Sequence, residues 1–463
     1  MKKISIAQIE NAAGARLLCG RKEKLIGNIC TDSREAKEGD IFFALIGENR
    51  DAHKYAEGAL QNGCTSFVMS DEAAAAALIE KAPDVDILMT QDTTRALQLL
   101  AKWYIGTFDG LKVIGVTGSN GKTSTKDMLY YICSEKYKTV CNRGNLNNHI
   151  GMPLTILSMD EGTEVAVLEM GMSAFGEIHT LVDIARPQIG LITNIGISHM
   201  EYLGSREGIL KAKMEITDFF DENCVLIVNG GNDLLTPENT KGNYKLISVG
   251  EKGKQDLRIS DIDDMGEEGI KFKLEHNLVM QMFELSVPGV HNASNAALAV
   301  AAGLELGITL EEAARGLSKM VLTEKRLSIR GKNGYKIIDD TYNASPDSMK
   351  SALDVLASTK GIRKVAILGD MYELGKDTQK FHMEVGAYAK EKKTDCLITV
   401  GELGKFIAQG AVSAGMKDVL SFETKAALAE KLNELVRPGD VILVKASRGL
   451  AMEEIVKKIP EQL

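Results

Sequence analysis

The stretch Val113-Ile114-Gly115-Val116-Thr117-Gly118-Ser119-Asn120-Gly121-Lys122-Thr123 decides how the middle of this 463-residue chain folds. Residues 113–116 form a continuous apolar run, which is typical of a strand buried on both faces of a parallel sheet. The glycines at 118 and 121 allow a tight turn and a close approach to an anion. A helix beginning near Lys122 would point its N–H groups and the positive end of its dipole at that anion. The stretch therefore predicts a strand, a phosphate-binding loop and a helix.

Two side chains complete the chemistry of this loop. Lys122 supplies a point charge for the β- and γ-phosphates of a nucleotide, and Thr123 supplies a hydroxyl for Mg²⁺. The general phosphate-loop pattern has one more glycine, at the position that Val116 occupies here, so this is the shorter Gly-x-x-Gly-Lys-Thr form. We expect ATP as the ligand. The residues expected to bind its phosphates are Gly118, Ser119, Asn120, Gly121, Lys122, Thr123 and Ser124.

Apolar runs alternate with helical patterns on both sides of the loop, and this alternation predicts a doubly wound α/β fold. The strands predicted in the middle and last blocks are residues 113–116, 165–168, 191–193, 225–228, 336–338, 365–368, 396–400 and 441–444. Residues 243–290 alternate polar with apolar and predict antiparallel strands before a helix near Asn292. The first block predicts a short apolar stretch at 40–45 and helices near 55–62 and 92–108. We predict three domains, residues 1–110, 111–321 and 322–463.

Composition excludes several classes of protein. The net charge of −9 argues against a general nucleic-acid-binding protein, which needs a basic face. The seven cysteines are scattered without Cys-x-x-Cys spacing, which argues against a zinc site and favours reduced thiols in a cytoplasm. No run approaches the roughly 20 apolar residues of a membrane span. We therefore expect a cytoplasmic protein that does not span a membrane.

Several motifs follow the loop in a fixed order: Glu169-Met170-Gly171, then Asn194-Ile195-Gly196-Ile197-Ser198-His199, then His291-Asn292-Ala293-Ser294-Asn295. Together with residues 118–125 they resemble the Mur ligases and their relatives, the folylpolyglutamate synthetases, over essentially the whole chain. The resemblance implies an N-terminal α/β domain that binds a UDP-linked precursor. It also implies a central doubly wound mononucleotide-binding domain and a C-terminal Rossmann-like domain.

The resemblance implies a metal centre beside the phosphate loop. Thr123 and Glu169 would bind Mg²⁺, and His199 would contact a second metal ion. Lys213 resembles the family lysine that CO₂ converts to a carbamate, an anion that helps to hold the metal, although the neighbouring Lys211 is an alternative assignment. The catalytic residues expected from the resemblance are Lys122, Glu169, His199, Lys213 and Arg326.

The resemblance also assigns the rest of the nucleotide site. Asn292 and Asn295 are spaced i,i+3 and share a helix face, so both amides would contact the adenine edge. Arg326 would meet the γ-phosphate and Asp339 the nucleotide, both from the third block, so closure of that block would complete the site. The family usually shows Asn-Ala-Asn-Pro where this chain has Ser345 in place of the second asparagine.

The two remaining substrates have expected contacts of their own. Ser33 and Arg34 would contact the nucleotide sugar of the UDP-linked precursor, and Asn147 and Asn148 would meet that precursor near its reacting end. On the side of the incoming amine, the resemblance points to three residues of the third block. These residues are Tyr342, Asn343 and Arg448.

Residues 339–346 and 368–375 best match the family member that uses ATP to join D-alanyl-D-alanine to UDP-N-acetylmuramoyl-tripeptide through an acyl phosphate. Its product is the pentapeptide precursor of peptidoglycan, the bacterial cell wall. A ligase that adds a single amino acid, a folylpolyglutamate synthetase and a non-ligase ATP-binding regulatory module remain alternatives. The sequence leaves open whether the tripeptide ends in lysine or diaminopimelate, and we expect a monomer.

Overall fold

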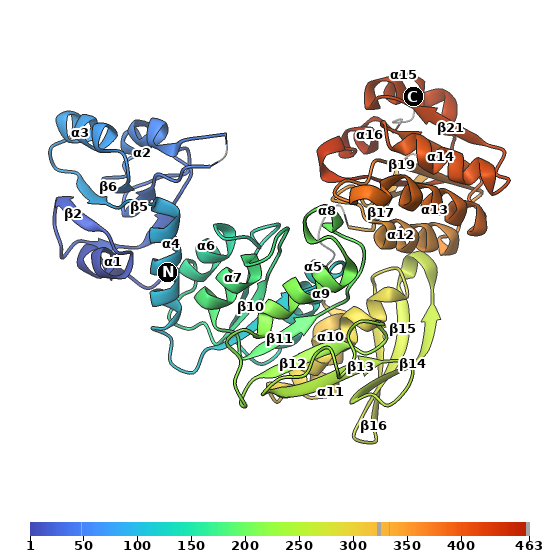
Figure 1. The fold of residues 1–463 in the computed structure, drawn as a ribbon, viewed down its shortest axis with the longest axis horizontal. Helices are drawn as coiled ribbons and strands as arrows, with labels where there is room; N and C mark the ends of the chain where they lie inside the picture. The colour runs from blue at the N-terminus through green and yellow to red at the C-terminus, as the bar shows by residue number, and fades with distance from the viewer. Residues whose placement is uncertain (48, 322–325, 333, 460–463) are drawn as a thin grey trace. The chain divides into compact units, whose positions relative to one another are not determined.

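The computed structural model describes residues 1–47, 49–321, 326–332 and 334–459. Sheets of five, nine and six strands, with helices between their strands, and a two-stranded sheet make it the α/β protein that the alternating pattern predicts (Figure 1). The chain packs as two compact units, which are described separately. The first unit contains residues 1–115, 137–172 and 176–188, and the second contains residues 116–136, 173–175 and 189–463. The domain boundaries near residues 110 and 322 stay predictions.

The first unit contains the N-terminal sheet. Its apolar side chains, such as Phe42, Phe67 and Ile87, pack against helices α2 and α3 in one buried cluster. The four strands after β2 run parallel, and β2 is antiparallel to its neighbour. The strands in sheet order are β2 (Arg16–Cys19), β7 (Asp86–Met89), β6 (Ser66–Met69), β5 (Asp40–Phe43) and β4 (Asn28–Cys30). The helices are α1 (Ile6–Ala12), α2 (Ala56–Gln61), α3 (Glu72–Lys81) and α4 (Thr93–Ile105), and β1 (Ile4–Ser5) pairs with β3 (Leu25–Ile26).

The nine-stranded sheet begins as a parallel sheet and ends as an antiparallel one. Its strands in sheet order are β9 (Thr139–Cys141), β10 (Val165–Glu169), β8 (Lys112–Thr117), β11 (Ile189–Ile192), β12 (Val225–Asn229), β13 (Lys245–Gly250), β14 (Leu257–Asp264), β15 (Ile270–His276) and β16 (Val279–Leu285). The last three are antiparallel to one another, as predicted for residues 243–290, whereas β13 lies in the same range but runs parallel to both of its neighbours. The buried runs of β8, β10, β11 and β12 confirm the strands predicted around the loop.

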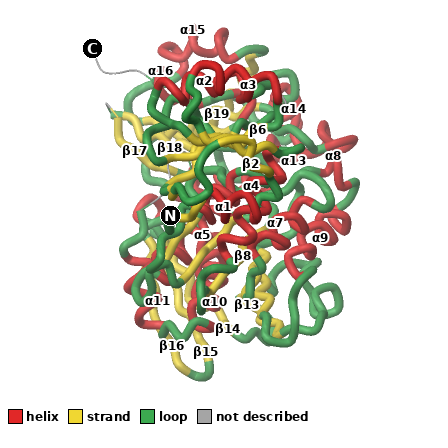
Figure 2. The backbone as a smooth tube through the Cα atoms, turned by 90° about the vertical axis from the view of Figure 1, so that its left-hand side faces the viewer, coloured by secondary structure: helices red, strands yellow, loops and turns green. Residues whose placement is uncertain are grey.

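The helices that follow these strands are α5 (Lys122–Cys133), α6 (Gly151–Leu157), α7 (Glu177–Ala185), α8 (Met200–Leu203), α9 (Arg206–Met214), α10 (His291–Glu305) and α11 (Leu310–Ser318). In the second unit, α10 packs against α5 and against β12, β13 and β14, and α10 and α11 lie beside the antiparallel strands (Figures 1 and 2). The small residues of α10 permit a close approach, because a Cβ on Gly303 would lie 2.8 Å from Cγ2 of Ile132 in α5. This contact holds the helix that carries Asn295 against the phosphate-loop helix.

The six-stranded sheet also belongs to the second unit and is covered on both faces. Alternate residues of one strand enter different clusters: Ala366 and Leu368 pack with α12, α13 and α14, whereas Val365 and Ile367 pack with α15 and α16. The strands in sheet order are β17 (Ser328–Lys332), β18 (Tyr335–Asp339), β22 (Asp440–Lys445), β19 (Arg363–Gly369), β20 (Cys396–Val400) and β21 (Val419–Phe422). The helices are α12 (Pro346–Ser358), α13 (Thr378–Glu391), α14 (Gly404–Ser413), α15 (Lys425–Leu435) and α16 (Glu453–Lys458).

Candidate functional site

The phosphate loop joins β8 to α5, and two of its glycines are required by their surroundings. Gly121 has a φ of +80°, and a Cβ there would lie 2.5 Å from Oδ1 of Asn295. At Gly118, where φ is +149°, a Cβ would overlap Oγ1 of Thr193. Lys122 folds back over the loop and donates from Nζ to the carbonyl oxygen of Gly118 over 2.7 Å. The loop therefore has the backbone and the cation that an anionic ligand needs.

The segment after β11 holds the phosphate loop in place. The amide N–H of Asn120 donates to Oδ1 of Asn194 over 2.9 Å, and the N–H of Ser119 donates to the Asn194 carbonyl over 3.0 Å. Oγ1 of Thr193 donates to the carbonyl oxygen of Asn120 over 2.5 Å, and the N–H of Gly196 donates to Oγ of Ser119 over 2.9 Å. Because each segment both donates to and accepts from the other, the phosphate loop and residues 193–196 restrict each other's motion.

Lys213 and Lys211 lie in very different environments, although both belong to α9. Lys213 is buried, with 1% of its surface exposed, whereas Lys211 is exposed and its ammonium lies 5.8 Å from the ring centroid of Phe175. Burial, and secondarily the positive charge of Lys122, lowers the pKa of Lys213 well below its usual range. A neutral amine at position 213 can react with an electrophile, which a solvated ammonium cannot.

Glu169, at the carboxyl end of β10 in the first unit, is a buried carboxylate with a defined orientation. Nδ2 of Asn147 donates to Oε1 of Glu169 over 2.7 Å, and Asn142 bonds both the N–H and the carbonyl of Glu169. Asn148, in contrast, accepts the N–H groups of Ile150 and Gly151 and forms the turn into α6. The two adjacent asparagines thus have different roles, and only Asn147 contacts the predicted metal ligand.

His199 contacts a carboxylate of the third block. Its backbone has a left-handed φ of +54°, and Nδ1 lies 2.5 Å from Oε2 of Glu373, another residue with a positive φ. This contact lowers the pKa of Glu373 from its usual value. Among the residues that the structure describes, no three His, Cys, Asp or Glu side chains gather in a way that could hold a metal ion. A metal at His199 could bind Nε2 while Glu373 keeps its contact with Nδ1, because the two ring nitrogens are distinct.

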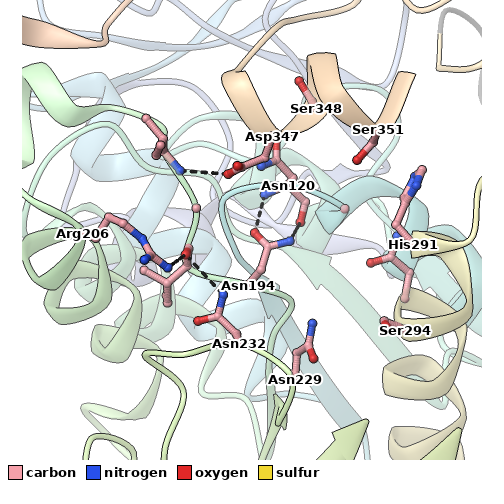
Figure 3. Close-up of a pocket in the computed structure, with 15 residues that line it drawn as sticks. Asn120, Asn194, Arg206, Asn229, Asn232, His291, Ser294, Asp347, Ser348 and Ser351 are labelled. Atoms are coloured by element: carbon pink, nitrogen blue, oxygen red, sulfur yellow. Dashed lines mark hydrogen bonds between the residues drawn. The ribbon is translucent and has the colours of Figure 1, made fainter. Parts of the chain in front are cut away.

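A pocket of about 400 Å³ lies beside the phosphate loop in the second unit, within the usual size range of small-molecule sites (Figure 3). Asn295 lines it, but the two amides predicted to face a base differ. Asn292 is buried, its Oδ1 accepts from Nδ2 of Asn295 over 2.9 Å, and its own Nδ2 donates to the carbonyl of Pro288. Asn292 therefore orients Asn295, which presents its Oδ1 on the Gly121 side.

The remaining pocket walls include polar residues that the sequence analysis did not single out. These residues are Arg206, Asn229, Asn232, Ser294, Asp347, Ser348 and Ser351. Arg206 and Asn232 both donate to the carbonyl oxygen of Ile195 (Figure 3). Arg206 also forms a bidentate pair with Asp233. One signal was available: Asn229 ends β12 as Glu169 ends β10, and the carboxyl ends of parallel strands face the ligand crevice in such sheets.

In the third block, the predicted Arg326 lies over the ring of Tyr342, with 4.0 Å between its guanidinium carbon and the ring centroid. Asp339 is buried and accepts from Oγ1 of Thr341 over 2.7 Å. Lys445 pairs with Asp340 over 2.5 Å and also donates to the carbonyl oxygen of Asn343. The predicted substrate residue Arg448 is exposed and pairs with Glu453 over 2.7 Å.

The residues predicted to bind the UDP-linked precursor lie in the first unit. Arg34 is exposed and bonds the carboxylate of Asp32, and this contact lowers the pKa of Asp32 to about 2. The carbonyl of Ser33 accepts from Nδ2 of Asn62 over 2.8 Å. In the turn at 51–53, Nδ1 of His53 lies 2.7 Å from Oδ1 of Asp51 and its Nε2 accepts from the N–H of Ser70. Across the described part of the chain, no helix is both long and apolar enough to cross a bilayer.

Comparisons with known proteins converge on one family. The model of the Mur ligase middle domain matches residues 116–303, and that of the Mur ligase glutamate ligase domain matches residues 325–448. The chain is 42% identical over 444 residues to a UDP-N-acetylmuramoyl-tripeptide–D-alanyl-D-alanine ligase of Bacillus subtilis (strain 168), covering 95% of this chain and 94% of the relative.

Solved structures agree with the sequence comparison. A crystal structure of MurF from Acinetobacter baumannii superimposes with a TM-score of 0.89 at 32% identity, covering 99% of each chain. MurF ligase from Thermotoga maritima, in complex with ADP, superimposes with a TM-score of 0.79 at 28% identity, covering 93% of this chain and 96% of that one. Both similarities extend over nearly the whole chain.

Proposed function

The chain belongs to the Mur ligase family, and we propose that within it this enzyme joins D-alanyl-D-alanine to UDP-N-acetylmuramoyl-tripeptide at the expense of ATP. The full-length similarity to ligases of that name carries the proposal. The phosphate loop, the buried Lys213 and the amide-lined pocket support it from the chemistry of this chain. The activity places the protein in peptidoglycan synthesis, which supports cell shape and cell division, and we propose that it acts as a cytoplasmic monomer.

The proposed reaction has two steps. An oxygen of the terminal carboxylate of the tripeptide attacks the γ-phosphorus of ATP, so that an acyl phosphate forms and ADP leaves. The amine of D-alanyl-D-alanine then adds to the acyl carbon, and the tetrahedral intermediate expels phosphate while the nitrogen loses a proton. A free carboxylate is a poor acylating agent, so activation must precede amide formation. The family reaction needs positioned charges and no nucleophilic side chain.

The residues of the phosphate loop have the roles of binding and charge compensation. Gly118, Ser119, Gly121 and Ser124 offer backbone groups close to the phosphates, and Lys122 would turn its ammonium from the loop carbonyls to the phosphate oxygens. Thr123 is a buried hydroxyl at the start of α5. Asn295 would contact the base, and Asn292 would hold the side chain of Asn295. Asp339 would bind the nucleotide from the third block. Arg326, held on Tyr342, would offset charge at the γ-phosphate.

The donor chemistry fits Mg²⁺. The ion prefers oxygen ligands, takes few of them from protein and completes its shell with water and phosphate oxygens. Thr123 offers a hydroxyl, and Glu169 offers a carboxylate that Asn147 already orients. When bound, the metal neutralises charge that develops on the transferred phosphoryl group. His199 would contact a second metal ion through Nε2, while Nδ1 keeps its contact with Glu373.

Lys213 is the residue that we propose to be carbamylated. Burial lowers its pKa and favours the neutral amine, which is the form that attacks CO₂. A C–N bond then forms as one C=O π bond of CO₂ opens, one N–H proton leaves, and the neutral amine becomes a carbamate anion near Lys122. Lys211 is exposed and lacks this burial. The difference in burial supports Lys213, rather than Lys211, as the lysine that corresponds to the carbamylated family lysine.

The residues proposed to bind the other two substrates belong to the first block, to residues 147–148 and to the third block. Ser33 and Arg34 of the N-terminal domain would contact the uridine nucleotide, and Asn147 would touch the precursor near the carboxylate that reacts. Tyr342, Asn343 and Arg448 would face the dipeptide. The exposed guanidinium of Arg448 suits a dipeptide carboxylate, which arginine binds with two parallel N–H groups.

Phosphate release tests this function. Purified enzyme with ATP, Mg²⁺ and UDP-N-acetylmuramoyl-tripeptide should release phosphate continuously only after D-alanyl-D-alanine is added. The matched controls replace the dipeptide with alanine, glutamate, lysine or diaminopimelate, one at a time. Turnover with a single amino acid and none with the dipeptide would assign another Mur ligase activity. Turnover of ATP that ignores both substrates would instead support a regulatory ATP-binding module.

A further inference from the structure

The start of α12 in the third block contacts the phosphate loop directly. Ser345, the N-cap of α12, donates from Oγ to Oδ1 of Asn120 over 2.9 Å, although the two residues lie 225 positions apart in the chain. Ser345 is buried. The other end of α12 also meets the middle of the chain, because a Cβ on Gly266 would lie 2.7 Å from the carbonyl oxygen of Ser358. The helix is therefore held against the second block at both ends.

The hydrogen bonds around Ser345 define where its hydroxyl proton goes. Ser348 donates from Oγ to the carbonyl of Ser345 and accepts at Oγ from the N–H of Ser345, so its own hydroxyl proton is used. Oγ of Ser345 accepts the N–H of Ser348 as an N-cap. The hydroxyl of Ser345 has two acceptors within reach, Oδ1 of Asn120 at 2.9 Å and Oγ of Ser348 at 3.1 Å, and the bond to Asn120 is the shorter. Because the two ends of an amide are distinguished by their partners, this bond determines which end of Asn120 faces Ser345.

A second contact from the same turn holds the segment that supports the loop. Oδ2 of Asp347 accepts the N–H of Ile197 over 3.1 Å (Figure 3). A Cβ on Gly196 would collide with this carboxylate oxygen and would lie 3.3 Å from Nδ2 of Asn120. The amide of Asn120 and the carboxylate of Asp347 therefore converge on Gly196, whose N–H donates to Oγ of Ser119. Only a glycine leaves room for both.

We infer that Ser345 is a positioning residue for ATP: it holds the side chain of Asn120, and through it the phosphate loop, in the conformation that binds the nucleotide phosphates. The inference rests on the proposed function in that the loop binds ATP. Ser345 acts through Asn120, and the adjacent Asp347 reinforces it through Ile197. Ordering a loop before the ligand arrives removes that cost from binding, so loss of the bond weakens nucleotide affinity. Ser345 thereby acts on the loop without itself touching the phosphates.

The test measures the Kd of ADP in the presence of Mg²⁺ by titration calorimetry, using the full-length chain. Ser345→Gly removes the hydroxyl but is a tolerated N-cap, whereas Ser345→Thr keeps both hydroxyl and cap. The matched control is Thr424→Gly, which alters the N-cap of α15 in the same sheet domain without touching the phosphate loop. We expect Ser345→Gly to raise the Kd about 3- to 10-fold, as loss of one net hydrogen bond implies. Ser345→Thr and Thr424→Gly should stay within about twofold.

A second background makes the test specific for Asn120. In Asn120→Ala, the further change Ser345→Gly should alter the Kd by less than about twofold, because the partner of the hydroxyl is gone. The inference is overturned if Ser345→Gly binds ADP like the wild type, or if it weakens binding equally in both backgrounds. If wild-type protein does not bind ADP, the ATP site itself is wrong. If the ADP results hold while the dipeptide assay fails, only the substrate assignment fails.

Discussion

Lys213 and Lys211 lie two positions apart on α9, and one is buried with a lowered pKa while the other is exposed beside Phe175. Lys213→Ala should therefore lower kcat by at least about 100-fold, the loss typical of a removed electrostatic group in an active site. Lys211→Ala should retain activity within about twofold, since exposed surface substitutions are usually mild. Initial rates of phosphate release measure both. Added bicarbonate should not restore Lys213→Ala, and equal losses in the two variants would contradict the assignment.

Replacing Gly121 should abolish nucleotide binding as well as lower the stability of the fold. Gly121→Ala meets two penalties: a left-handed φ and a Cβ placed 2.5 Å from Oδ1 of Asn295. Gly110→Ala is the matched control, because its φ is +72° and nothing lies within 4 Å of the added Cβ. Both should lose roughly 1 kcal/mol of stability from backbone strain. Only Gly121→Ala should lose ADP binding in calorimetry, and unchanged ADP affinity in that variant would refute the close packing of α10 on the loop.

The two asparagines of α10 should separate binding from stability. Asn295→Ala removes a side chain that lines the pocket and leaves one buried acceptor, Oδ1 of Asn292, without its donor, so KM for ATP should rise several-fold with a smaller loss of Tm than in Asn292→Ala. Asn292→Ala leaves Nδ2 of Asn295 and the carbonyl of Pro288 without their buried partner, which costs about 1–3 kcal/mol of stability. Thermal unfolding and steady-state kinetics on both variants give the two values. A larger Tm loss in Asn295→Ala than in Asn292→Ala would contradict this division.

His382 should make stability depend on pH. It is buried, its Nε2 accepts from the N–H of Met371 over 3.0 Å, and its Nδ1 donates to the carbonyl of Thr378, so the neutral ring is required. Burial lowers its pKa below the usual 6.5. The unfolded chain then binds the proton more readily, so the contribution to stability is full above about pH 6.5 and is lost as pH falls through the folded pKa. His382→Asn should be less stable at pH 7.5, with a Tm gap to wild type that narrows towards pH 5. A gap that widens would contradict the neutral ring.

Local features were predictable from the sequence. The strand 113–116, the loop and the helix from Lys122 are adjacent in the chain and carry strong apolar and glycine signals, and the structure has β8 and α5 there. Strand ends such as Glu169 were predictable for the same reason. The N-terminal sheet was harder, because β2, β4 and β6 are strands of three or four residues without a long apolar run.

Distant contacts were not predictable. Helical spacing places Asn292 and Asn295 on one face, but it does not predict that the Asn292 side chain accepts a hydrogen bond from Asn295 and orients it. The bonds from Ser345 to Asn120 and from Asp347 to Ile197 join segments more than 100 residues apart, and only the folded chain brings them together. Ser345 stands where the family pattern usually has asparagine. In the folded chain its hydroxyl contacts Asn120 of the phosphate loop.

The mass of the reaction product tests the central claim most directly. Enzyme incubated with ATP, Mg²⁺, UDP-N-acetylmuramoyl-tripeptide and D-alanyl-D-alanine should yield one new UDP-linked species. Its mass should exceed that of the tripeptide precursor by the mass of the dipeptide less one water, and fragmentation should locate the dipeptide at the end of the peptide. An unchanged precursor, with ATP consumed, or a product extended by a single amino acid supplied in place of the dipeptide would contradict the account.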